Sequence, residues 1–488
     1  MNGSLKKTKI VATLGPACNS KTTIHNLIKN GVNVFRINFS HAKKEEVLNY
    51  VNIIRGLNKE HDYNTAILAD LQGPKIRIGE LEQDITLKKD DEIFIESSGK
   101  SFVGNKNRIF VNYKNFAKDV KTEDHILIDD GKYHFKVLKT DKKSKVKLQA
   151  LNAVCLKSRK GVNLPNSKIS TPSLTQKDVK DVKFAISFEV DWIALSFVRQ
   201  GKDLIALKTL IDKFSKARLS KAKIPIIAKI EKPEALENIE DIIKNSDGIM
   251  VARGDLGIEI PSQEVPLIQK KLVNLSKMAR IPVIIATQMM ESMIESSTPT
   301  RAEVNDVANS VMDGADAVML SAETSVGKNP VETVTQISNI INSVEYSDQI
   351  NVPEEPPTMK TDRYITKFIC YHAAKTANEI NAAAITTMTH SGYTGFQISS
   401  WRPHCNILVF TSNKRILCRQ SLLWGVNAFY YNKEVSTDKT IVHINEILTS
   451  KGFAKKGDMV INLVAMPISE HGEKKGGMVN TLRISEIS

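Results

Sequence analysis

Apolar residues along the first two thirds of the chain fall into eight short runs, and stretches with helical spacing separate most of them. The runs are rich in Val and Ile and nearly continuous in hydrophobicity, as is typical of parallel strands that are covered on both faces. They occupy residues 9–14, 32–38, 65–70, 191–197, 224–231, 248–252, 281–287 and 316–320. Eight strand–helix units predict an α/β fold, the (β/α)8 TIM barrel.

Start signals support several of the predicted helices. Ser20 is a suitable N-cap for the first of them. Thr175 opens a Thr-Gln-Lys-Asp capping box before apolar residues at helical spacing, and Pro330 suits the first position of the last barrel helix.

Residues 74–171 interrupt the strand–helix rhythm after the third predicted strand. They contain short β segments at 84–87, 92–96, 108–111, 126–128, 133–138 and 146–150. Asp129-Asp130-Gly131 is a turn signal between two of these segments. The pattern predicts an inserted all-β domain that acts as a lid over the barrel mouth.

The stretch 351–357, after the last predicted barrel helix, combines prolines with glutamates and predicts a linker. Helical and strand patterns alternate again beyond it, which predicts a C-terminal α/β domain. The expected domains are the barrel (1–73 and 172–347), the inserted β-barrel lid (74–171) and the C-terminal domain (354–488).

Composition and charge narrow the class of protein. The formal net charge is +14, but the lysines are scattered and not interleaved with aromatic residues, so we expect no nucleic-acid partner. No apolar run reaches about 18 residues, so no membrane span is expected. The polar N-terminus does not resemble a signal peptide, and the five cysteines are far apart, which predicts a cytoplasmic protein.

The predicted active site lies at the carboxyl ends of the barrel strands, where barrels of this type bind substrates. Seven of the eight runs end in polar or charged residues. Lys229 and Glu231 stand two apart on the fifth strand and therefore point to the same face. Two interpretations stay open: a structural ion pair, or a magnesium site of Glu231 and Asp255 in which Lys229 faces a transferring phosphoryl group.

Two further residues at strand ends suit anionic ligands. Arg36 would hold a phosphate or a carboxylate, and Gly254 lets a ligand approach the backbone closely. The segment 15–22 nearly matches a phosphate-binding P-loop, but Ser20 replaces the second glycine and Pro16 removes an N–H group. We interpret that segment as a plain strand–turn–helix connection.

These motifs resemble those of pyruvate kinases over the barrel and its insertion, and less closely over the C-terminal domain. The matching stretches are TKIVATLGP (8–16), NVFRINFSH (33–41), DLQGPKIR (70–77), KGVNLP (160–165), AKIE (228–231), VARGDLGIEI (251–260), ATQMMESM (286–293), PTRAEVNDVANSV (299–311) and DAVMLSAETSVGKNP (316–330). ATQMMESM together with MLSAET is highly specific. The resemblance implies a phosphotransferase of glycolysis that converts phosphoenolpyruvate and ADP to pyruvate and ATP.

The same resemblance implies a role for each candidate residue. The catalytic residues would be Lys229, Thr287 and Ser321. Phosphoenolpyruvate would contact Arg36, Gly254, Asp255 and Thr287. The nucleotide, ADP or ATP, would lie near Asn38, His41, Arg77 and Lys160. Mg²⁺, with Mn²⁺ as an alternative, would be held by Glu231 and Asp255.

The monovalent-cation position implied by the family is formed by Asn38, Ser40, Asp70 and the carbonyl of Leu71. This chain reads Leu-Gln-Gly-Pro-Lys at 71–75, where potassium-dependent members tend to read Thr-Lys-Gly-Pro-Glu. The Lys75 ammonium would fill the space of the ion, so we expect that potassium is not required. The alternative is that Lys75 is a solvated lysine.

The C-terminal domain of this family binds an allosteric effector, and in this chain we expect a phosphorylated one. This chain resembles the phosphate loop of that domain at Thr389, Ser391, Gly392 and Thr394, and residues 470–477 would form the facing loop. A plain glycine-containing turn is the alternative. The family precedent also implies a homotetramer.

Three other classes of protein remain as alternatives. A metal-dependent aldolase or lyase that acts on phosphoenolpyruvate or pyruvate would need neither the β insertion nor ATQMMESM. A regulatory protein without catalysis is disfavoured because all the expected catalytic residue types are present. The third alternative is the nucleic-acid binder that the scattered lysines already disfavour.

Overall fold

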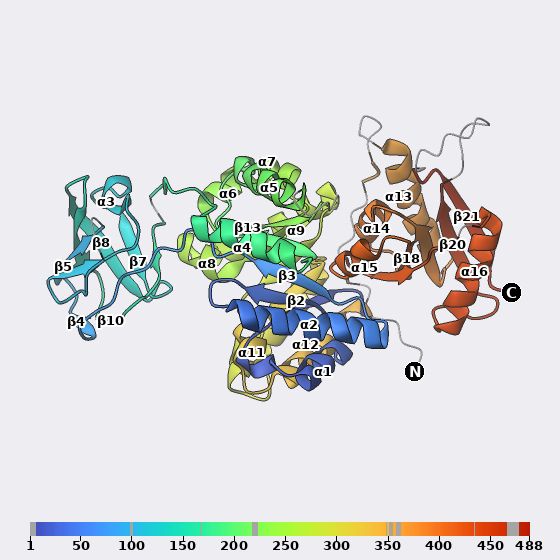
Figure 1. Ribbon diagram of the computed structural model, residues 1–488, viewed down its shortest axis with the longest axis horizontal. Coiled ribbons are helices and arrows are strands. Elements are labelled where there is room, and N and C mark those ends of the chain that lie inside the picture. Colours follow the sequence, from blue (N-terminus) through green and yellow to red (C-terminus); the bar gives the residue numbers. More distant parts are fainter. Residues whose placement is uncertain are drawn as a thin grey trace.

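The structure, a computed structural model, describes residues 6–97, 101–165, 167–216, 223–347, 349–350, 355–357, 363–433, 435–465 and 478–488. Figure 1 shows three bodies in a row: a β-rich body at one end, a barrel in the middle and an α/β body at the other end. None of the described helices is long and apolar enough to cross a membrane. The predicted linker lies mostly outside the described residues, the predicted facing loop lies wholly outside them, and the domain limits stay predictions.

Eight parallel strands close into a barrel in the order β1-β16-β15-β14-β13-β12-β3-β2, which confirms the predicted fold. Their bounds are β1 (Lys9–Thr13), β2 (Val32–Asn38), β3 (Ala66–Asp70), β12 (Trp192–Leu195), β13 (Ile226–Ile230), β14 (Gly248–Ala252), β15 (Val283–Ala286) and β16 (Ala317–Leu320). The predicted runs 32–38 and 248–252 coincide with β2 and β14. The other strands are shorter than their runs at one or both ends, where polar residues such as Asp191 and apolar residues such as Phe197 lie outside the strand.

Side chains inside the barrel change from apolar to polar along β1, β2, β3, β12 and β13. The apolar layer includes Val11, Val34, Leu68, Ala194 and Ile227. Since side chains alternate along a strand, the residues two positions further on point into the same interior. These residues are Thr13, Arg36, Asp70, Ser196 and Lys229. The carboxyl ends of the strands, the mouth of the barrel, therefore carry a polar layer above an apolar core.

Helices surround the barrel, and the predicted start signals are in place. The Ser20 hydroxyl accepts a hydrogen bond from the Thr23 N–H at 3.0 Å, and Thr175 forms a capping box with Asp178. The helices are α1 (Lys21–Lys29), α2 (Lys44–His61), α4 (Gln176–Ser187), α5 (Gly201–Lys216), α6 (Pro233–Glu237), α7 (Ile239–Asn245), α8 (Arg253–Glu259), α9 (Val265–Ala279), α10 (Arg301–Met312), α11 (Ala322–Ser325) and α12 (Pro330–Glu345).

The insertion between β3 and α4 is a separate β-rich body with its own core (Figure 1). A sheet in the order β11-β7-β8-β9-β5-β6 is joined by the pair β10-β4. The bounds are β4 (Ile85–Leu87), β5 (Glu92–Glu96), β6 (Arg108–Phe110), β7 (His125–Ile128), β8 (Tyr133–Thr140), β9 (Lys145–Ala150), β10 (Val154–Leu156) and β11 (Val162–Asn163). The predicted turn joins β7 to β8, since Asp129, Asp130 and Gly131 all have positive φ. The prediction was a purely β domain, but the body also contains one short helix, α3 (Phe116–Asp119).

The C-terminal body is a five-stranded sheet in the order β19-β18-β17-β20-β21, with the last strand antiparallel. Its elements are α13 (Tyr364–Glu379), β17 (Ala384–Met388), α14 (Tyr393–Ser399), β18 (Asn406–Thr411), α15 (Lys414–Gln420), β19 (Val426–Tyr430), α16 (Thr437–Ser450), β20 (Met459–Val464) and β21 (Thr481–Glu486). Leu422 packs into the apolar interior of the barrel, and the Trp192 indole N–H donates to the Arg419 carbonyl at 3.2 Å. This body therefore closes the floor of the barrel, the end at which the strands begin.

Candidate active site

Asp70 is the centre of the polar layer at the barrel mouth. The Nε and Nη2 atoms of Arg36 both lie 2.7 Å from Asp70 Oδ2, and the Lys229 Nζ atom lies 3.2 Å from Asp70 Oδ1. Burial raises the pKa of Asp70, but Lys229 and Arg36 outweigh burial and hold this pKa below its ordinary value. Three strands thus contribute one charged group each to a buried network. We call Arg36, Asp70, Lys229 and Glu231 the mouth cluster.

Lys229 has three partners in this network. Its ammonium lies 2.9 Å from Glu231 Oε1 and donates to the Ser196 hydroxyl at 2.8 Å, besides its contact with Asp70. Burial lowers the pKa of Lys229, but the two carboxylates outweigh it and raise the pKa above its ordinary value. The side chain is therefore a fixed positive charge beneath the mouth.

Glu231 is less well compensated than Asp70. Its Oε2 atom accepts the Phe197 N–H at 2.7 Å, but burial, opposed by Lys229, raises its pKa, and Asp255 raises it further. The Asp255 carboxylate makes no hydrogen bond or ion pair with any of the described side chains, and its backbone belongs to α8. Two neighbouring carboxylates with too little positive charge form a set that favours a bound cation.

The donor set fits magnesium. The described ranges contain no group of three or more His, Cys, Asp or Glu that would hold a metal ion by itself. Mg²⁺ usually takes one or two carboxylates and completes its shell with water and substrate oxygens, and Mn²⁺ accepts the same oxygen donors. Glu231 and Asp255 offer carboxylate oxygens of this kind.

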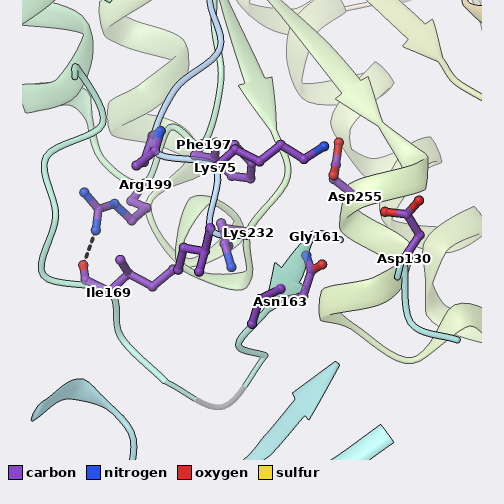
Figure 2. A pocket seen from close by; sticks show the side chains of 12 residues that line it. Lys75, Asp130, Gly161, Asn163, Ile169, Phe197, Arg199, Lys232 and Asp255 are labelled. Carbon is purple, nitrogen blue, oxygen red and sulfur yellow. Dashed lines mark hydrogen bonds between the residues drawn. The ribbon is translucent and has the colours of Figure 1, made fainter. Parts of the chain in front are cut away.

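A pocket lies beside Asp255, between the barrel and the inserted body (Figure 2). Lys75, Lys232, Asn163 and Asp130 are among the residues that line it. In Figure 2 the Lys75 side chain extends toward Asp255. The pocket therefore joins groups from both bodies next to the candidate metal carboxylates.

Thr287 contacts Gly254, the residue before Asp255. The Gly254 N–H donates to the Thr287 hydroxyl at 2.7 Å, and a methyl group at Gly254 would lie 3.3 Å from that oxygen. Thr287 has a φ of 71°, which a β-branched residue rarely adopts and which typically costs 1–3 kcal/mol. Ser321 follows β16, and its N–H donates to Glu323 at 2.6 Å. No pattern in the sequence indicates the strained backbone of Thr287.

The residues predicted for the nucleotide lie in two groups. Burial lowers the pKa of His41, and the neighbouring charges of Arg77, Lys75, Arg36 and Lys177 lower it further, so these cations surround it. Asn38 accepts the Ser40 N–H at 3.0 Å at the end of β2. Lys160 is paired with Asp129 within the inserted body, at 2.7 Å.

The predicted monovalent-cation residues are close together, but Lys75 is directed elsewhere. The Leu71 carbonyl accepts the Ser196 hydroxyl at 2.7 Å, beside Asp70. Arg36 contacts Oδ2 of Asp70 and Lys229 contacts Oδ1. The described contacts of Asp70 do not include Lys75. Replacement of potassium by Lys75 stays a prediction. Ser196 is a residue of this site for which no role was predicted, although its place at a strand end was a signal.

Of the predicted effector residues, Thr389, Ser391 and Gly392 lie in the turn before α14, and Thr394 lies in the first turn of that helix. The Gly392 N–H donates to the Thr389 hydroxyl at 3.0 Å, and the Tyr393 N–H donates to the Ser391 hydroxyl at 3.4 Å. Gly392 has a φ of 84°, and Thr394 is buried. The hydroxyl groups of the turn thus bond to its own backbone, and effector binding stays a prediction.

Comparison with known proteins identifies the family. Residues 5–334 match the family model for the pyruvate kinase barrel domain, and residues 367–485 match the model for the pyruvate kinase alpha/beta domain. The chain belongs to the pyruvate kinase family. The pyruvate kinase of Corynebacterium glutamicum is 38% identical over 462 residues, which cover 95% of this chain and 94% of that protein. A pyruvate kinase of Staphylococcus aureus is 38% identical over 470 residues, which cover 96% of this chain and 79% of that protein.

A solved pyruvate kinase has the same architecture. The crystal structure of a pyruvate kinase from Cryptosporidium parvum superposes with a TM-score of 0.89 at 33% identity, covering 99% of this chain and 96% of that chain. Membership of the pyruvate kinase family makes this protein a phosphotransferase of glycolysis, as the resemblance implied. The alternatives of an aldolase or lyase, a non-catalytic regulator and a nucleic-acid binder are not supported.

Proposed function

We propose that the barrel mouth transfers the phosphoryl group of phosphoenolpyruvate to ADP, with magnesium as cofactor. The observation that carries this proposal is the Lys229 ammonium, held between Asp70 and Glu231 next to the Asp255 pocket. A charge fixed by buried carboxylates stabilises a transferring phosphoryl group without reorganising.

Glu231 and Asp255 would hold the metal. When bound, Mg²⁺ neutralises charge on the phosphoryl oxygens and orients the two substrates. Arg36, which already bonds to Asp70 and to Thr13, would present its guanidinium to the anionic groups of phosphoenolpyruvate. The Gly254 backbone and the Thr287 hydroxyl would line the same substrate.

Removal of the phosphoryl group leaves the enolate of pyruvate, which must gain a proton at carbon to become the ketone. Thr287 and Ser321 are the hydroxyl groups that we assign to this proton route. Asn38, His41, Arg77 and Lys160 would contact ADP, since the cationic side chains of Arg77 and Lys160 suit a polyphosphate.

Four further properties belong to this proposal. The enzyme works without potassium because Lys75 supplies a positive charge, it acts in the cytoplasm, and it forms a homotetramer. Its C-terminal body binds a phosphorylated effector at Thr389, Ser391, Gly392 and Thr394.

A coupled assay tests the proposed reaction and its potassium requirement together. Purified full-length protein is given phosphoenolpyruvate, ADP and Mg²⁺ in tetramethylammonium or potassium buffers of equal ionic strength, and pyruvate formation is recorded. We expect ADP-dependent turnover that potassium changes little, and a Lys75→Glu variant that is slow until potassium is added. Pyruvate release without ADP, or no turnover by folded protein, would contradict the function. A large gain of the unmodified protein with potassium would contradict the role of Lys75.

A further inference from the structure

The inserted body contacts the short barrel helix α8, besides its contacts with Arg199 of the barrel. The Asn163 side-chain N–H at the end of β11 donates to Glu259 Oε1, the last residue of α8, at 2.9 Å. At the β7–β8 turn, a methyl group on Gly131 would lie 3.5 Å from Cγ2 of Ile258, also in α8. Two separate loops of the inserted body therefore touch the same end of this helix.

Glu259 receives a second donor at the same oxygen. The Lys232 ammonium lies 2.6 Å from Glu259 Oε1, and the two side chains are only 6% and 1% exposed. The other oxygen, Oε2, is buried and has no hydrogen-bond partner among the described residues. Since the acceptor is an ionised carboxylate, the Asn163 contact is a charge-assisted hydrogen bond, which is stronger than a neutral one.

This pair is linked along the chain to both candidate metal ligands. Lys232 directly follows Glu231, and Glu259 lies four residues after Asp255, one helical turn along α8. Figure 2 shows Asn163, Lys232 and Asp255 around the same pocket, between the two bodies. The Lys232–Glu259 pair, which the inserted body contacts, is therefore connected by short stretches of chain to the two residues that would hold the metal beside the nucleotide.

We propose that Asn163 is a positioning residue for the nucleotide: its hydrogen bond to the Lys232–Glu259 pair sets the distance between the inserted body and the barrel. The inference rests on the proposed function, since it assigns the pocket to a nucleoside diphosphate. Loss of the contact leaves Lys229 and its partners in place. It therefore weakens nucleotide binding, while chemistry and phosphoenolpyruvate binding persist.

An exchange of donor and acceptor separates this role from simple packing. Asn163→Asp places a second carboxylate beside Glu259 and repels it. The double variant Asn163→Asp with Glu259→Gln restores one carboxylate and one amide with their places exchanged, so the hydrogen bond and the partner for Lys232 return. Asn163→Ala removes the bond without adding charge, and Lys147→Ala, which breaks an exposed ion pair with Glu92 inside the inserted body, is the matched control.

Steady-state kinetics of the full-length variants give the decisive comparison. We expect the KM for ADP to rise about tenfold in Asn163→Ala and more in Asn163→Asp, as for loss of one hydrogen bond to a charged group. The KM for phosphoenolpyruvate and kcat stay near those of the unmodified protein, as they do in Lys147→Ala. The double variant recovers most of the ADP affinity. Unchanged KM for ADP in both single variants, or no recovery in the double variant, overturns the proposal.

Small-angle X-ray scattering tests the docking without relying on activity. Asn163→Asp should enlarge the maximum dimension of the particle, and the double variant should return it to that of the unmodified protein. Equal dimensions in all three proteins overturn the docking role. If the unmodified protein has no turnover, the proposed function fails while the scattering result still decides whether Asn163 holds the two bodies together.

Discussion

The two ends of the barrel both bury charged side chains, but they do so with different partners. At the mouth, Lys229 lies between the carboxylates of Asp70 and Glu231. At the floor, the Arg402 guanidinium from the C-terminal body pairs with Asp316 of the barrel at 3.0 Å, and the Lys9 ammonium donates to the Val426 carbonyl at 2.8 Å. We call Lys9, Asp316 and Arg402 the floor cluster. The Arg402–Asp316 and Lys9–Val426 contacts both cross from the barrel to the C-terminal body.

The pKa values of the two buried lysines, Lys9 and Lys229, shift in opposite directions. Burial lowers the pKa of Lys9 to about 8, and Glu345 offsets only part of this effect. Burial acts on Lys229 as well, yet the adjacent carboxylates raise its pKa above the ordinary value. Burial of a charge therefore does not by itself indicate function. A lysine surrounded by carboxylates beside an open pocket suits catalysis, whereas a lysine bonded to a neighbouring backbone suits assembly.

The largest effect is expected at Lys229. Lys229→Met removes the fixed charge beneath the transferring group and should lower kcat by about a hundredfold or more. The same variant should still exchange the methyl protons of pyruvate with solvent, because Thr287 and Ser321 are unchanged. Turnover close to that of the unmodified enzyme in folded protein would refute the catalytic role, and loss of both activities would point to a general collapse of the mouth.

The second-largest effect is expected at the two carboxylates that would hold the metal. Glu231→Gln and Asp255→Asn should each raise the magnesium concentration needed for half-maximal activity by about tenfold or more, since each removes one of two charged ligands. Glu323→Gln is a matched control, because Glu323 is a buried strand-end carboxylate bonded to the N–H groups of Ser321 and Met290. An unchanged magnesium requirement in both test variants would mean that the metal is held elsewhere.

At the floor, stability should change and catalysis should not. Arg402→Met leaves Asp316 buried without its cation, which should cost about 3–5 kcal/mol in the free energy of unfolding. All three tryptophans of the chain, Trp192, Trp401 and Trp424, are buried at this end, so fluorescence during urea unfolding reports on it directly. A loss of kcat with no loss of stability would reverse the contrast between the two ends.

The smallest effect concerns pH. Because the pKa of Lys9 falls from 10.5 to about 8 on folding, the unfolded chain binds more protons at this residue between these values. The stability contributed by Lys9 should therefore rise with pH across this range. The check is the melting temperature of the unmodified protein relative to Lys9→Met at the two ends of the range. A difference that stays constant or moves the other way would contradict the lowered pKa.

Periodicity predicted the barrel well because buried parallel strands leave an apolar run wherever they occur. The run 191–197 still overshot β12, since Asp191 bonds to Arg55 and Phe197 leaves the strand with a φ of 55°. Strand ends also located the mouth, including Lys229 and Glu231 on one face. These features depend on residues close together in sequence, which a pattern can detect.

Sequence patterns could not predict contacts between segments that lie far apart along the chain. Arg36 and Asp70 come from neighbouring strands, and their ion pair depends on the stagger of those strands. The Asn163–Glu259 and Arg402–Asp316 contacts join different bodies, and no local pattern records how bodies are oriented. The direction of Lys75 likewise depends on the chain path after Gly73, whose φ is 65°.

One measurement tests most directly whether catalysis depends on the buried lysine at the mouth and not on the one at the floor. It compares kcat of Lys229→Met and of Lys9→Met, determined side by side on folded protein. Both substitutions replace a buried lysine of the same barrel by a side chain of similar length. We predict a loss of about a hundredfold or more at position 229 and a value within about threefold of the unmodified enzyme at position 9. Equal losses at the two positions, or a larger loss at position 9, would contradict the account.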